Sequence, residues 1–436
     1  MSGGSAWTGA AVAAVTAGYA LFSRRLAATA VSAPMVFTGF GVLIGPVGLD
    51  VLDLRHDAGP VLTLVEAALA LVLFTDAMAV RRRDLRTGGF LPLRLLAVGL
   101  PLSIGAGWLL AWPLLPGLTM WEFALLGAIL APTDAALGKS AIASPRVPAV
   151  VRRGLHVESG LNDGLVLPFF LLFLAAIPGT ATAEEGVSGV FWRALVLSTA
   201  LGLAGGWLGG RLLCWSRAKG WVTREWREVF VLAVAFGSYS LAVATDGSGF
   251  ISAWVAGFAF GVGLRSQEPV TGEGTDERTA DLAEYLGGLL ATLSFVVFGA
   301  VLLGPALEHL DWRIVTYAVL SLTVVRMAPV ALSLAGSRFR LPTVAYIGWF
   351  GPRGLASITF GLLVVEEHVP GVDPLGTVIS VTVGLSILLH GVSAVALADR
   401  YGGWYEGETA VTPGLREGTG VAEAAERRQP GHRRLR

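Results

Sequence analysis

The chain has 436 residues, of which 54% are hydrophobic and only 15% are charged. Its 32 basic and 32 acidic residues give a formal net charge of zero, which excludes the positive field expected of a nucleic-acid-binding protein. The single cysteine, Cys214, excludes an internal disulfide bond and a cysteine-based metal cluster.

Apolar runs long enough to cross a bilayer recur from one end of the chain to the other. A membrane-spanning helix needs about 20 mostly apolar residues, so the pattern predicts an all-α polytopic membrane protein. Residues 1–401 are expected to form the transmembrane domain, and the polar segment 402–436 a disordered cytoplasmic tail. Thirteen spans are predicted, at residues 6–22, 31–49, 59–80, 90–113, 120–142, 155–177, 188–214, 226–245, 250–265, 281–304, 312–335, 341–366 and 374–398.

The distribution of Lys and Arg over the loops predicts the orientation of these spans. Twenty of the 32 basic residues fall on one side of the membrane and three on the other; six lie in the tail, Arg400 lies just before it, and Arg326 and Arg353 lie deep inside spans. Basic loops remain in the cytoplasm. We therefore expect a multi-pass protein of the cell membrane, with its N-terminus outside and its C-terminus in the cytoplasm.

The thirteen spans divide into six, a linker and six, which is the arrangement expected of an inverted 6+6 repeat. In such folds the site lies where two corresponding spans are broken by Pro or Gly. Residues 131–134 (Ala-Pro-Thr-Asp) interrupt the fifth span of the first half, and residues 351–354 (Gly-Pro-Arg-Gly) interrupt the fifth span of the second half. The sequence therefore predicts two broken crossover helices.

A polar cluster opens the sixth predicted span. Residues 158–164 include Glu158, Ser159, Asn162 and Asp163. Ser159, Asn162 and Asp163 are spaced i, i+3 and i+4, so they share one helix face. A charge within a span costs about 2.5–3.5 kcal/mol on insertion scales and marks an ion pathway by default.

The cluster and the first interruption are expected to form one ion site. Thr133 and Asp134 would lie at the depth of Asp163, and their oxygen atoms are hard ligands suited to a small cation. Desolvation disfavours the charged form of a buried carboxyl group, so a proton and a cation would compete for Asp163. The structural alternative for Asp163 is a helix-start or interhelical hydrogen bond, and Glu158 and Asn162 could equally be structural.

Three further charged residues lie within the predicted spans. Arg326 needs a counter-charge, for which Glu158 is the preferred partner and Asp163 the rival. Arg353 is expected to compensate the carbonyl groups and helix dipoles of the second interruption. Asp76 either joins the ion site or caps the cytoplasmic end of its helix.

Taken in order and spacing, the motifs 132–134, 158–164 and 351–354 resemble those of the monovalent cation:proton antiporters, in the branch of NhaP and the sodium/proton exchangers. The resemblance covers nearly all of residues 6–398. It implies the NhaA/NhaP-like antiporter fold, a homodimer, and a six-helix core formed by spans within about 59–177 and 281–398. It also implies an elevator-type stroke of this core against a dimerisation domain. Ala135 departs from the pattern, because the family often has Pro after the aspartate.

The resemblance also implies roles for single residues. Asp163 would carry the cation and the proton, and Asn162 beside it implies electroneutral exchange. Thr133, Asp134 and Ser159 would be ligands or close neighbours of the ion, with Asp76 as a further candidate. Glu158 would pair with Arg326. The expected activity is exchange of Na⁺, or of Li⁺ or K⁺, for H⁺, with no cofactor besides the transported ions.

Other functions are compatible with parts of the pattern. A cation channel would favour a continuous polar lining, whereas the polar groups here concentrate at one depth. An ion-coupled transporter of organic anions would want free basic groups facing the substrate, and only Arg326 and Arg353 are available for that role. An intramembrane enzyme has no supporting motif such as His-Glu-x-x-His.

Overall fold

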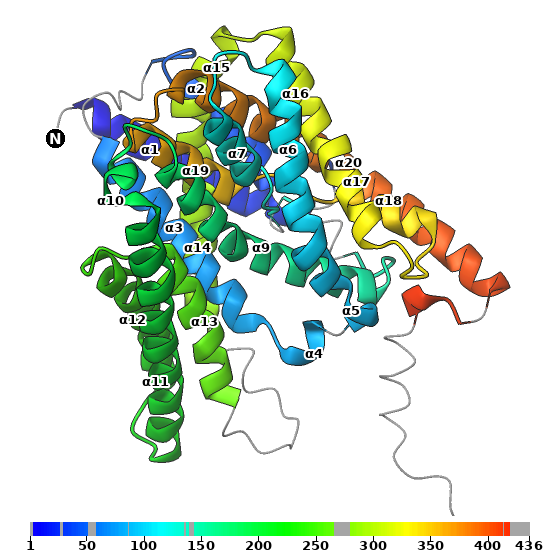
Figure 1. Cartoon of the computed structure of the whole chain (residues 1–436). Helices are drawn as coiled ribbons and strands as arrows, with labels where there is room; N and C mark the ends of the chain where they lie inside the picture. Colours follow the sequence, from blue (N-terminus) through cyan, green and yellow to red (C-terminus); the bar gives the residue numbers. More distant parts are fainter. Residues whose placement is uncertain are drawn as a thin grey trace, which may run out of the picture.

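The computed structural model describes residues 3–26, 29–50, 58–85, 87–134, 137–138, 144–265, 280–412 and 414–418. Over these residues the chain is helical and contains no strand (Figure 1). This confirms the predicted all-α class. Helices suit a bilayer because they satisfy every backbone hydrogen-bonding group within one segment.

The described helices follow one another along the chain in this order. The first part contains α1 (Gly3–Leu26), α2 (Ala33–Ile44), α3 (Ala58–Ala79), α4 (Arg82–Leu85), α5 (Thr87–Arg94), the π-helical turn η1 (Leu95–Gly99), α6 (Leu100–Leu114), α7 (Met120–Ile129) and α9 (Ala149–Ala175). The middle part contains α10 (Ala181–Val190), η2 (Phe191–Leu197), α11 (Ser198–Ala218), α12 (Arg224–Val243) and α13 (Gly249–Arg265). The last part contains α14 (Asp281–Val297), η3 (Phe298–Leu303), α15 (Gly304–Glu308), α16 (Trp312–Leu322), α17 (Val324–Ser333), α18 (Leu341–Trp349), α19 (Leu355–Glu366), α20 (Val372–Val411) and η4 (Arg416–Gly418).

Every one of the thirteen predicted spans overlaps at least one of these helices. Within the described residues, eight helical stretches are long and apolar enough to cross a membrane, and four shorter apolar helices accompany them. The number of crossings and the inverted symmetry of the two halves remain predictions.

Both predicted interruptions coincide with helix ends, and most of the first interrupted span beyond Asp134 lies outside the described residues. Helix α7 ends at Ile129, just before Pro132, and residues 350–354 separate α18 from α19. Proline lacks the N–H group that a continuing helix would need. The two breaks contact each other, because the Asp134 N–H donates to the Pro352 carbonyl over 2.8 Å.

Helices α3, α9 and α14 lie between two outer groups of helices (Figure 1). One group contains α11, α12 and α13, drawn in green, and the other contains α16, α17, α18 and α20. Helices α11 and α13 approach closely, since a Cβ atom on Gly202, Gly206 or Gly210 would meet the backbone of α13. This spacing of small residues lets membrane helices pack backbone to backbone.

Helix α20 continues to Val411, so the predicted tail boundary at Gly402 falls inside a helix. Beyond it, Glu417 in η4 is 1% exposed and caps the start of α18. Its Oε1 accepts hydrogen bonds from the Arg340 N–H (3.0 Å) and the Thr343 hydroxyl (2.8 Å). The end of the described chain is thereby attached to the helix that precedes the second interruption. Residues 419–436 lie outside the described residues.

Replacing Glu417 with alanine should destabilise the protein by about 1–3 kcal/mol, because the buried donors of α18 would lose their acceptor. Glu408→Ala is the matched control: Glu408 forms a partly exposed ion pair with Arg340 at 3.6 Å and accepts a hydrogen bond from the Thr412 hydroxyl over 3.3 Å, and about 0–1 kcal/mol is expected for such an exposed pair. Thermal unfolding in detergent would compare the two variants. Equal losses would contradict the capping role of Glu417.

Candidate functional site

The first interruption is held against α9 by two side chains of the predicted cluster. The Ser159 hydroxyl donates to the Thr133 carbonyl, and the Asn162 amide donates to the Thr133 hydroxyl over 2.7 Å. Thr133 and Asn162 are 2% and 1% exposed. The helical spacing of Ser159 and Asn162 places both groups on the face that meets the break. Thr133 therefore lies beside the polar cluster, as the sequence predicts.

Asp163 lies one helical turn beyond Ser159 and is buried, at 8% exposed. Among the described residues, no hydrogen-bond partner is present for its Oδ1 atom. The next residue, Gly164, lies against the indole ring of Trp254 on α13, where any Cβ atom would meet the ring. The structure thus places a buried carboxyl group beside the broken helix, and the described residues provide no hydrogen bond that would give it a purely structural role.

Asp134 lies at the contact between the two breaks. Its Oδ2 accepts a hydrogen bond from the Leu355 N–H over 3.1 Å, at the first residue of α19. A helix N-terminus carries partial positive charge, so this carboxylate is stabilised there. Gly354 must lack a side chain because the Asp134 carboxyl group occupies that space. Ala135, the departure from the family pattern, lies outside the described residues.

Arg353 lies at the opposite end of the crossover and is fully buried. Its Nη1 donates to the carbonyl groups of Ala131 (2.6 Å) and Pro132 (3.0 Å), beyond the C-terminal end of α7. Its backbone N–H donates to Ser386 on α20 over 2.7 Å. The Arg353 side chain thus donates hydrogen bonds to the two carbonyl groups that follow the end of α7 at the first break. Those two carbonyls therefore already accept a hydrogen bond from a cationic side chain.

Glu158 and Arg326 form a buried two-pronged ion pair. Arg326 Nη1 lies 2.6 Å from Glu158 Oε1, and Nη2 lies 2.9 Å from Oε2. Both residues are 2% exposed. The guanidinium group also lies against Gly351, where a Cβ atom would meet Nε. The pair therefore connects α9, α17 and the second break, and the structure places Arg326 with Glu158 rather than with Asp163.

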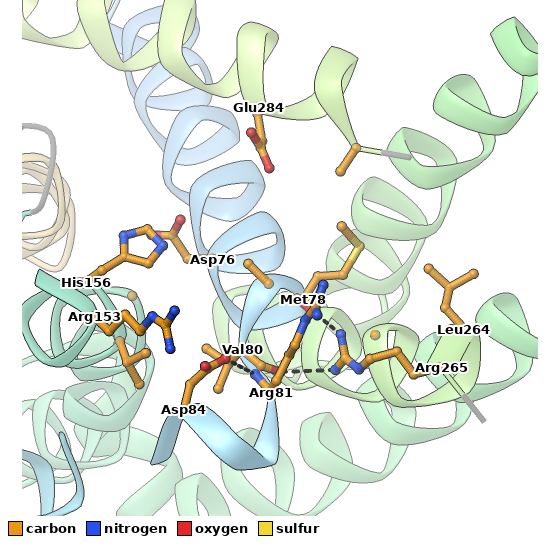
Figure 2. Close-up of a pocket in the computed structure, with 15 residues that line it drawn as sticks. Asp76, Met78, Val80, Arg81, Asp84, Arg153, His156, Leu264, Arg265 and Glu284 are labelled. Carbon is orange, nitrogen blue, oxygen red and sulfur yellow. Dashed lines mark hydrogen bonds between the residues drawn. The ribbon is translucent and has the colours of Figure 1, made fainter. Parts of the chain in front are cut away.

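Asp76, near the end of α3, contacts α9 at Gly160, where a Cβ atom would lie 3.2 Å from the Asp76 Cβ atom. It lines a cavity of about 380 Å³ (Figure 2). His156 and Arg153 on α9 line the cavity beside Asp76, and Glu284 on α14 lines it from across (Figure 2). The Asp76 carboxyl group therefore lies beside Gly160, the residue that follows Ser159, on the wall of this cavity.

Asp76, Asp134 and Asp163 lie within electrostatic range of one another. They do not converge tightly: over the described residues, no three Asp, Glu, His or Cys side chains could hold a metal ion together.

Sequence reasoning missed several neighbours of the site. Trp254 is uncharged, so nothing in the sequence distinguishes it as a site residue. Its place beside the site is seen only from the contact of its ring with Gly164. Ser357 donates to the Ile129 carbonyl over 2.7 Å and joins the two broken helices. The ring nitrogens of His390 lie 2.9 Å from the Ser386 and Trp349 carbonyl oxygens. Hydroxyl-bearing residues in spans are too common to be singled out without the fold.

Two broken helices crossing beside a buried acid define a multi-pass membrane transporter fold. A family model for the sodium/hydrogen exchanger, transmembrane, matches residues 11–400. The chain belongs to this family, whose members are transporters and not enzymes.

Curated relatives and solved structures agree with the family. The K(+)/H(+) antiporter NhaP2 of Shewanella sp. (strain MR-4) is 27% identical over 89% of this chain and 66% of its own length. The Na(+)/H(+) antiporter of Saccharomyces cerevisiae is 27% identical over 75% of this chain and 34% of its own length. The chain thus spans less than two thirds of the length of these relatives. The sodium proton antiporter MjNhaP1 from Methanocaldococcus jannaschii has the same fold, with a TM-score of 0.74, 18% identity, and coverage of 92% of this chain and 99% of that one.

Proposed function

We propose that the chain exchanges a monovalent cation for a proton across a cell membrane, with Asp163 as the group for which the two compete. The observation that carries the proposal is a buried carboxyl group, without a hydrogen bond to its Oδ1 from the described residues, beside the oxygen atoms of a broken helix. Family membership and the names of the relatives, which include both Na⁺/H⁺ and K⁺/H⁺ antiporters, support it.

The chemistry follows from electrostatics. A lone carboxylate in a dry site is costly, so it takes up either a proton or a cation. The hydroxyl of Ser159 and the oxygen atoms of Thr133 offer further hard ligands to a cation. Asp76 and Asp134 add negative potential that attracts cations to the site. Each transport step would carry one species or the other, which couples the two flows.

The cavity at Asp76 supplies a route between this site and one side of the membrane. It is lined by Arg81, which follows α3, by Asp84 in α4 and by Arg265 at the end of α13. Because basic residues are abundant in these loops, the positive-inside rule favours the cytoplasm as the side that the cavity faces. The N-terminus would then lie outside and the C-terminus inside.

The remaining expectations concern movement and stoichiometry. The core helices, within residues 59–177 and 281–398, would move as one body against a domain containing α11–α13, and two copies would associate as a homodimer. Asn162 in place of a second acid leaves one titrating group in the pair, which favours electroneutral exchange of one cation for one proton.

Proteoliposomes with an imposed pH gradient test the exchange. Addition of NaCl, LiCl or KCl should dissipate the gradient when the protein is present, while choline chloride should not. A membrane potential set with an ionophore should leave an electroneutral rate unchanged. Collapse of the gradient before any cation is added would indicate a proton leak or channel, and no response to any cation would refute the proposed function.

A further inference from the structure

A second feature of the molecule is an apolar groove, which lies away from the ion site between α17, α18 and α20. Its volume is about 580 Å³. It is walled by apolar and aromatic side chains, among them Met327, Ala345, Trp349, Leu397, Tyr401 and Trp404. Tyr401 stacks on Trp404 with ring centroids 5.5 Å apart, so one end of the groove is aromatic.

The sequence of α20 indicates the depth of the groove in the bilayer. Residues 375–398 carry no Asp, Glu, Lys or Arg and extend over about 36 Å at 1.5 Å per residue. This length exceeds the roughly 30 Å hydrocarbon layer, so the first charges after it, Asp399 and Arg400, lie at the level of the lipid headgroups. Trp349 donates to Ser393, two turns earlier on α20, over 2.9 Å. The groove therefore runs from the headgroup level into the hydrocarbon layer.

Arg400 is the one charged side chain that lines the groove. It is exposed, and within the described residues it forms no ion pair. The carboxylates around it already have partners: Asp399 lies 3.3 Å from Arg146, and Glu408 lies 3.6 Å from Arg340. An uncompensated guanidinium group therefore stands at the mouth of an apolar groove.

We propose that this groove binds an anionic phospholipid, with its phosphate on Arg400 and one acyl chain along Met327, Ala345 and Trp349. Arginine matches phosphate geometry with two hydrogen bonds, and Tyr and Trp favour the level where headgroup and acyl chain meet. The lipid would contact both α18 and α20, and would thus brace the helix that precedes the second break. The site is independent of the proposed exchange activity.

Native mass spectrometry of the detergent-solubilised full chain, titrated with phosphatidylglycerol or phosphatidylcholine, tests this site. Wild type should bind phosphatidylglycerol more tightly. Arg400→Gln should weaken that binding about fivefold, the effect of one basic residue at an anionic surface, and should weaken phosphatidylcholine binding less, because that lipid has a phosphate but no net charge. Ala345→Trp fills the groove and should remove one binding event for either lipid. Arg217→Gln, at the end of α11, is the control and should behave as wild type.

Wild-type affinity in Arg400→Gln would overturn the headgroup assignment, and wild-type binding in Ala345→Trp would overturn the groove. The spectra also report the number of copies in each particle. If Ala345→Trp separated a dimer without losing lipid, the groove would be a contact between copies and the lipid proposal would be wrong.

Discussion

Asp163→Asn is expected to abolish exchange of every cation, reducing gradient dissipation to the level of protein-free liposomes. Asparagine has nearly the same shape as aspartate but neither ionises nor takes up a proton at neutral pH. Without the ionised form the site has no charge to balance a cation, and without the protonated form it cannot return loaded with a proton. The measurement is the response of a pH-sensitive dye in proteoliposomes to Na⁺, Li⁺ and K⁺.

The same variant should fold normally, because no described residue donates a hydrogen bond to the Oδ1 atom of this carboxyl group. Thermal unfolding of the purified protein would establish this. Asp373→Asn is the matched control, since Asp373 is exposed in the first turn of α20 and far in sequence from both breaks. Exchange that survives in a folded Asp163→Asn protein would show that another group carries the proton.

The parts of the fold that could be predicted are those governed by local chemistry. Lipid forces long apolar helices, so hydropathy located a helix in every predicted span. Proline lacks an N–H, so Pro132 and Pro352 marked the two breaks. The helical period brought Ser159 and Asn162 to one face, and the structure shows both bonded to Thr133.

The contacts that could not be predicted depend on where distant segments meet. Charge balance alone favours a partner for Arg326, but the choice of Glu158 requires α9 and α17 to adjoin. Nothing near Asp134 in the sequence shows that its carboxylate accepts a hydrogen bond from Leu355, 221 residues away. Glu417 lies in the stretch predicted as disordered tail, because a single buried hydrogen-bonded carboxylate leaves no periodic pattern. The helix-capping roles of these acids therefore appear only in the structure.

Breaking the ion pair between Glu158 and Arg326 should produce the largest loss of stability. Removing one partner of a buried pair leaves an uncompensated charge and costs about 3–5 kcal/mol. We expect Glu158→Leu and Arg326→Met each to lower the free energy of unfolding by about this amount, and the double variant to recover most of it. Denaturant titration and thermal unfolding in detergent would measure the cycle. A double variant no more stable than the worse single variant would contradict a direct pairing.

The two single variants should not be equal. The charge of Arg353 interacts with both members of the pair, so Arg326→Met leaves Glu158 beside one remaining arginine, whereas Glu158→Leu leaves two buried arginines without a carboxylate between them. Glu158→Leu is therefore expected to be the more damaging change. The partly exposed pair Arg224–Glu228, 3.9 Å apart, provides the control, where the same double removal should cost less than about 1 kcal/mol. If Arg326→Met proved the worse variant, the positive charge of Arg353 would be stabilised by the carbonyl groups of the first break rather than by Glu158.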